Sequence, residues 1–100
     1  MKSGYEVIWT DFALSELAET FEYLKFNFTD EEISKLANEL EHTINLISEN
    51  PLLFAKVDEN DVRRVVILKY NNLNYRIIEK SVEIISFFSN RQSPDKQKLY

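Results

Sequence analysis

The chain of 100 residues contains no cysteine and only one histidine. The absence of cysteine excludes disulfides, thiolate metal ligands and cysteine nucleophiles within this sequence, and it fits a reducing cytosol. The histidine, His42, has no second metal ligand near it in sequence, and it falls on the polar side of a predicted helix. We therefore expect His42 in solvent, and we predict no metal site and no cofactor.

Long apolar runs are also missing. The first residues, MKSGYEV, lack the apolar segment of a signal peptide. The longest uninterrupted apolar runs, such as Val65–Leu68, are far shorter than the ~18 residues that span a membrane. We predict a cytoplasmic protein without membrane contact. Its length fits a single domain, residues 1–100, with a polar tail at 94–100.

Charge is distributed unevenly along the chain. Residues 1–50 have a net charge of -8 and residues 51–100 a net charge of +3, within a total of -5. The acidic half is typical of solvated helix faces, and the basic half is where an anionic partner would bind. Alternatively, the basic residues only protect the edges of a sheet.

The acidic half predicts two helices after a short strand at Tyr5–Trp9. Thr10 or Asp11 can cap the first helix, which continues to about Phe26. Thr29 and Glu32 form a capping-box pattern for the second helix, which ends before Pro51. The expected core positions recur at helical spacing, whereas Glu16, Glu19 and Glu22 are expected in solvent. These core positions are Leu14, Leu17, Ala18, Phe21, Leu24, Ile33, Leu36, Ala37, Leu40, Ile44 and Ile47.

The basic half predicts three strands, at 62–70, 73–79 and 82–89. Asn71-Asn72 and Lys80-Ser81 are the expected two-residue turns between them. The order β-α-α-β-β-β then defines an α+β domain, in which a helical hairpin packs on an antiparallel sheet.

Two-residue turns would place Ile67 opposite Arg76 and Arg76 opposite Ile85. In this register one face is apolar and takes the helices, and it includes Val66, Tyr75, Ile84 and Phe88. Arg64 lies at the rim of that face opposite Glu79, so these two residues are predicted to form a structural ion pair.

The other face of the predicted sheet collects four cations together with Val65, Ile67, Glu83 and Phe87. Such a face is suited to a phosphate or a carboxylate-bearing partner. The alternative is a solvated face with one internal Arg–Glu83 pair. The predicted partner- or phosphate-binding residues are Arg63, Lys69, Arg76 and Arg91.

Four segments resemble the RelE/ParE superfamily of toxins from bacterial type II toxin–antitoxin modules. They are YEVIWTDFAL, LISENPLLF, VRRVVILKYNNLNYRI and VEIISFFSNRQSP, in this order over residues 5–95. The resemblance implies the same fold, two helices on an antiparallel sheet. It also implies a growth-inhibiting toxin of the kind found in plasmid-stabilising addiction modules.

The resemblance implies one of two alternative targets. RelE-like members cleave mRNA in the ribosomal A site, whereas ParE-like members inhibit DNA gyrase and are not nucleases. Tyr75-Arg76 and Arg91 match the RelE arginine positions, so these arginines would be catalytic in a RelE-like enzyme. The RelE lysine pair is not matched, since Lys69 corresponds to one lysine at most, and no general base is evident. We therefore favour a ParE-like, non-enzymatic toxin, with the ribosome-dependent endoribonuclease as the alternative.

A third interpretation is a degenerate domain that binds an antitoxin without being toxic. In each case the resemblance implies a cognate antitoxin as partner, in a hetero-oligomer. This antitoxin is expected to fold on binding and to cover the helical hairpin, the basic face or both.

Overall fold

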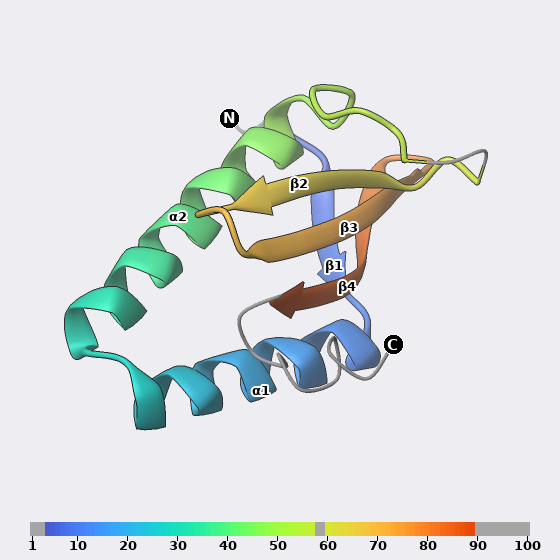
Figure 1. The fold of residues 1–100 in the computed structure, drawn as a ribbon. Coiled ribbons are helices and arrows are strands. Elements are labelled where there is room, and N and C mark those ends of the chain that lie inside the picture. The colour runs from blue at the N-terminus through green and yellow to red at the C-terminus, as the bar shows by residue number, and fades with distance from the viewer. Residues whose placement is uncertain (1–3, 58–59, 90–100) are drawn as a thin grey trace.

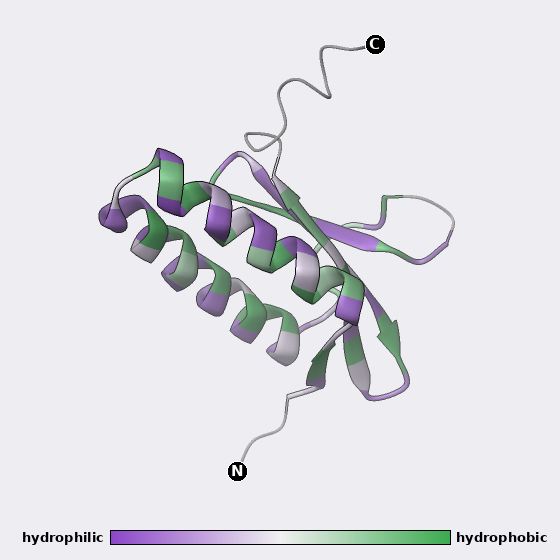
Figure 2. Ribbon diagram, turned by 90° about the horizontal axis from the view of Figure 1, so that it is seen from below, coloured by the Kyte–Doolittle hydropathy of each residue, from purple (hydrophilic) through white to green (hydrophobic). Residues whose placement is uncertain are grey.

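A computed structural model of the protein describes residues 4–57 and 60–89. The elements follow the predicted order β-α-α-β-β-β, and the two helices lie on the same side of the sheet (Figure 2). None of the helices in these two ranges is long and apolar enough to cross a membrane. The elements are β1 (Glu6–Trp9), α1 (Asp11–Asn27), α2 (Asp30–Glu49), β2 (Arg63–Ile67), β3 (Asn71–Ile78) and β4 (Ser81–Ser89).

The α+β fold class is confirmed, and the sheet is mixed rather than purely antiparallel. Its strand order is β1-β4-β3-β2, and β3 is antiparallel to both of its neighbours, β2 and β4. β1 pairs parallel to β4, from Glu6 opposite Ser81 to Trp9 opposite Ile84. Parallel neighbours need a long connection. Here that connection contains both helices and two strands (Figure 1).

Threonine side chains cap both helices, as predicted. Thr10 Oγ1 accepts a hydrogen bond from Ala13 N (3.1 Å), and Thr29 Oγ1 accepts one from Glu32 N (3.2 Å). The two helices form the expected hairpin and diverge from the connection between them (Figure 1). α2 ends at its C-cap residue, Asn50, which is followed by Pro51. Proline disfavours helical geometry in the residue before it, so the helix does not continue.

The buried stripe of α1 is rotated from the predicted one. Ala13, Thr20 and Leu24 are buried, and Leu17 and Phe21 pack against the core. The burial predicted for Leu14, Ala18 and Ala37 is wrong, since all three side chains are exposed. α1 packs mainly against β4, and two of its buried residues, Ala13 and Thr20, have small side chains. Thr20 can be buried because its hydroxyl donates to Glu16 O (3.0 Å) within the helix.

The predicted β2–β3 turn and register are wrong. The turn uses residues 68–70, so Ile67 lies opposite Asn71, not Arg76. Asn71 closes the turn by donating from Nδ2 to Ile67 O (3.0 Å). This register puts Val65 and Ile67 on the buried face with Tyr75, which the predicted turn would have prevented. An odd shift of pairing moves every side chain of β2 to the other face, so Val66 is exposed.

The pairing of β3 with β4 also differs from the prediction. The turn uses Glu79-Lys80, and Arg76 lies opposite Glu83 rather than Ile85. The register shifts between Asn74 and Tyr75, which leaves Ile85 as the extra residue of a β-bulge. Beyond the bulge the faces of β4 alternate the other way. Phe87 is therefore fully buried, whereas Phe88 had been expected on the helix side.

Candidate functional site

The four predicted binding cations do not share one face. Arg76 lies on the face away from the helices, opposite Glu83. Arg63 lies opposite the buried Tyr75 and therefore on the helix side of the sheet. Lys69 lies in the β2–β3 turn, and Arg91 lies outside the described residues. The predicted four-cation face is therefore wrong, because the odd shift of β2 separates Arg63 from Arg76.

Arg76 is paired with a carboxylate. Its Nε lies 2.9 Å from Glu83 Oε1, and the side chains are 50% and 27% exposed. The internal Arg–Glu83 pair of the alternative prediction is therefore present. A partly exposed pair contributes little stability, typically about 0–1 kcal/mol. Its main effect is to neutralise Arg76 locally, which weakens its attraction for phosphate.

Arg64 is structural, but its predicted partner is wrong. Register places Asn74 opposite Arg64, where Arg64 Nε donates to Asn74 Oδ1 (2.9 Å). Asn74 Nδ2 donates in turn to Ser86 Oγ (2.7 Å), and the Arg64 guanidinium lies 5.9 Å from the ring centroid of Phe88. Glu79 instead occupies the β3–β4 turn, with φ of 55°. The outer face therefore carries a polar row across three strands.

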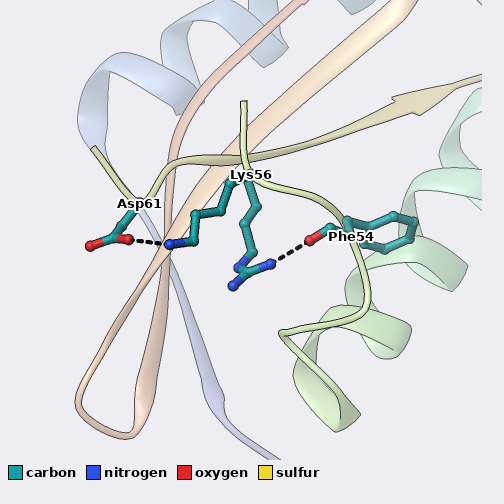
Figure 3. Close-up of polar contacts among 4 residues, drawn as sticks. Phe54, Lys56 and Asp61 are labelled. Carbon is teal, nitrogen blue, oxygen red and sulfur yellow. Dashed lines mark hydrogen bonds and ion pairs between the residues drawn. The ribbon is translucent and has the colours of Figure 1, made fainter. Parts of the chain in front are cut away.

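Arg63 fixes the segment that follows α2. Its Nη1 donates to Phe54 O (2.7 Å), and the Tyr75 hydroxyl donates to Pro51 O (2.6 Å). Lys56 Nζ lies 2.8 Å from Asp61 Oδ1 in the same region (Figure 3). Arg63 thus binds a backbone carbonyl and is not displayed for a partner.

Two pKa values in this region are perturbed. The hydrogen bond and charge of Lys56 lower the pKa of Asp61. Burial raises the pKa of Tyr75, although the nearby Arg63 charge opposes the rise. Tyr75 therefore stays protonated and keeps donating to Pro51 O.

Lys69 lines a cleft of about 410 Å³ between the helical hairpin and the β2–β3 turn. We call it the Lys35–Lys69 cleft. Its apolar part is formed by Leu24, Leu36 and Leu68. Its charged side chains are Glu32, Lys35 and Lys69, and its uncharged polar residues are Tyr70, Asn71 and Ser89.

Sequence reasoning missed Lys35 and misplaced Glu16. Lys35 comes near Lys69 only because residues 68–70 form the turn, and the sequence favoured Asn71-Asn72. Glu16 was expected in solvent, but Oε1 accepts from Phe87 N (2.7 Å). Burial raises the pKa of Glu16, the Phe87 hydrogen bond lowers it, and the charge of Glu19 raises it further. The net direction is upward.

No group of three or more histidine, aspartate or glutamate side chains in residues 4–57 and 60–89 is placed to hold a metal ion. His42 is exposed, as predicted. The three predicted binding cations that lie in the described residues thus have separate settings: Arg76 in the pair with Glu83, Arg63 in the contact with Phe54 O, and Lys69 in the Lys35–Lys69 cleft.

Solved structures share this arrangement of a helical hairpin on one side of a small sheet. One is described as a chromosomal ParDE toxin–antitoxin system from P. aeruginosa. It matches with a TM-score of 0.71 and 14% identity, over 85% of this chain and 95% of that chain. Another is the conserved hypothetical protein HP0894 from Helicobacter pylori. It has a TM-score of 0.56 and 12% identity, over 88% of this chain and 97% of that chain.

At these identities the structures establish the fold class alone. Comparison with curated protein sequences gives no match. A sequence family does match residues 7–94, and it is described as the ParE toxin of the type II toxin–antitoxin system parDE. The chain therefore belongs to the ParE toxin family of type II toxin–antitoxin systems.

Proposed function

We propose that the protein is a ParE-like toxin that inhibits growth by acting on DNA gyrase in the cytoplasm and is neutralised by a cognate antitoxin. The observation that carries this proposal is the match of residues 7–94 to the ParE toxin family. The ParDE system from P. aeruginosa, which has the same fold, supports an antitoxin as the partner.

The arrangement of charges favours this target over mRNA. Cleavage at phosphate requires cations that converge on the developing negative charge. Arg76 is instead engaged by Glu83 at 2.9 Å, Arg63 by Phe54 O at 2.7 Å, and Lys69 belongs to a separate cleft. A catalytic role for Arg76 and Arg91 belongs to the RelE-like alternative.

The test is to express the chain from a tightly controlled promoter and to follow labelled thymidine and labelled amino acid incorporation. Gyrase inhibition predicts that DNA synthesis fails first while translation continues. An immediate collapse of translation would support the ribosome-dependent nuclease. Normal growth with both labels unaffected would leave an antitoxin-binding domain without toxicity.

Purified protein gives a direct second measurement. Supercoiling of relaxed plasmid by gyrase should be inhibited as the protein is added, and a heat-denatured sample of the same protein is the control. Full supercoiling at a large excess of folded protein would exclude gyrase as the target.

A further inference from the structure

The Lys35–Lys69 cleft combines an apolar floor with two cations and one carboxylate, that of Glu32. Leu24, Leu36 and Leu68 come from three different elements, and all are buried or partly buried. Lys35 and Lys69 are both exposed. Concave sites with apolar walls and a few polar groups are typical of ligand pockets, which span about 300–1,000 Å³. The volume of about 410 Å³ is at the lower end of that range.

The turn that carries Lys69 has an uncommon backbone. Leu68 and Lys69 have φ of 52° and 73°. Residues with a Cβ rarely adopt this left-handed region. Packing of Leu68 on the core and the Asn71–Ile67 hydrogen bond hold the turn in place. Lys69 is therefore presented at the cleft by a fixed backbone.

Charge restricts what the cleft can bind. The protein has a net charge of -5, and the first turn of α2 carries Asp30 and Glu31 beside the cleft and Glu32 in the lining of the cleft. A uniformly anionic polymer such as RNA would be repelled by that turn. A carboxylate at the two lysines is favoured instead, when it is carried by a segment that is otherwise apolar or uncharged.

We propose that the Lys35–Lys69 cleft binds a short acidic segment of a protein partner. A bulky apolar side chain of this segment packs on the three leucines, and a neighbouring aspartate or glutamate binds Lys35 and Lys69. The proposal rests on the proposed function in one respect, because the antitoxin is the partner that would carry the segment. The binding chemistry itself does not depend on toxicity.

The experiment uses a displayed library of short random peptides selected on the full chain. Selected peptides are synthesised with a fluorescent label, and their affinity is measured by polarisation. The double variant Lys35→Gln/Lys69→Gln removes both cations of the cleft. Lys25→Gln/Lys80→Gln is the matched control, because it changes the net charge equally at exposed lysines that do not line the cleft. Thermal unfolding of both variants checks that the fold is retained.

The expected peptides place an acidic residue beside a bulky apolar residue. Their affinity should fall about tenfold for the cleft variant and less than about twofold for the control, with stronger binding at low salt. Alanine at the apolar position of the peptide should also weaken binding. Amide shifts on peptide addition should cluster in residues 32–36 and 68–71.

Three results would overturn the proposal. They are a selection that enriches no peptide, peptides that bind both variants equally, and amide shifts that cluster elsewhere. The growth assay separates this proposal from the proposed function. If the chain binds such peptides but leaves growth unaffected, the proposal for the cleft stands and the proposed toxin function is wrong. If the chain arrests growth but does not bind the peptides, only the proposal for the cleft is wrong.

Discussion

Glu16 Oε1 accepts a hydrogen bond from Phe87 N over 2.7 Å, so a helix side chain binds the edge of β4 where β1 has ended. β1 pairs with β4 up to Ile84, and Thr10 N donates to Ile84 O (3.1 Å) just beyond it. Glu16 then takes a backbone donor just past the bulge. The Glu16 side chain thus supplies the acceptor for Phe87 N, a backbone donor at a strand edge that would otherwise need a carbonyl from a neighbouring strand.

Replacing Glu16 by alanine should lower the free energy of unfolding by about 1–2 kcal/mol, because Phe87 N would lose its acceptor in a largely buried position. Glu16→Gln keeps an acceptor oxygen and should be tolerated far better. Urea denaturation at neutral pH measures both variants. Equal losses for alanine and glutamine would show that the Phe87 hydrogen bond is unimportant.

The raised pKa of Glu16 predicts a pH dependence of stability. A carboxyl group whose pKa is higher in the folded state favours the fold below its unfolded pKa, near the ordinary value of 4.5. That contribution is lost as the pH rises through the folded pKa. The stability of Glu16→Gln relative to wild type should therefore increase from acidic to neutral pH. Glu22→Gln on the same helix corrects for the loss of one surface charge.

Tyr75→Phe should destabilise the fold by about 1–2 kcal/mol, because Pro51 O would lose its buried donor. The loss should be visible as a lower urea midpoint with an unchanged denaturant slope. Tyr23→Phe, at a half-buried position in α1, is the control for removing a phenol hydroxyl. A midpoint within error of wild type for Tyr75→Phe would contradict the prediction.

Lys69→Gly should stabilise the fold by up to about 1 kcal/mol, since glycine adopts φ of 73° without strain. Lys69→Ala keeps the strain and should give no such gain. Lys80→Gly is the matched control in the other hairpin, at a position that does not have positive φ. Thermal unfolding compares the three variants. A gain for Lys80→Gly equal to that for Lys69→Gly would show that backbone strain is not the cause.

Gly4 packs closely against the end of α2. A Cβ at this position would lie 2.5 Å from Ser48 Oγ, which donates to Tyr5 O (2.8 Å). Gly4→Ala should therefore cost about 1–2 kcal/mol, as Ser48 must move and its hydrogen bond is disturbed. A double-mutant cycle with Ser48→Ala should give a coupling energy above about 0.5 kcal/mol. If the losses of stability from Gly4→Ala and Ser48→Ala are additive, the contact between these two residues does not contribute to stability.

Arg76→Ala should leave growth inhibition intact if the protein acts on gyrase without nuclease chemistry. Its cost in stability should be below about 1 kcal/mol, since the pair with Glu83 is partly exposed. Growth after induction is compared with that of wild type at equal protein levels, with Lys56→Ala as a control variant at a different surface ion pair. Complete loss of toxicity for Arg76→Ala alone would favour a catalytic arginine.

Local signals predicted the element order and the helix caps well. Thr10, Thr29 and Pro51 act within a few residues of their own position, so the sequence alone reports them. The face of α1 was harder to predict, because the helix buries Ala13 and Thr20 in preference to Leu14. The buried face of α1 is set by its packing against β4, which the pattern of residues within one helix does not contain.

Sheet register could not be read in the same way. Asn71-Asn72 is a plausible turn, but Asn71 instead closes a turn at residues 68–70, and this moved Arg63 and Arg76 to opposite faces. The bulge at Ile85 has no local signature either, although it decides that Phe87 is buried. The candidate cleft depends on that turn, so Lys35 and Lys69 could not have been grouped from sequence.

The parallel pairing of β1 with β4 also governs when the domain can fold. During synthesis β1 and α1 are made first, but the strand that β1 pairs with is completed only at Ser89. Until β4 is available, β1 has no neighbour in the sheet and Glu16 has no backbone amide to bind. Contacts between such distant segments slow folding. A nascent chain therefore completes its sheet only after β4 has left the ribosome.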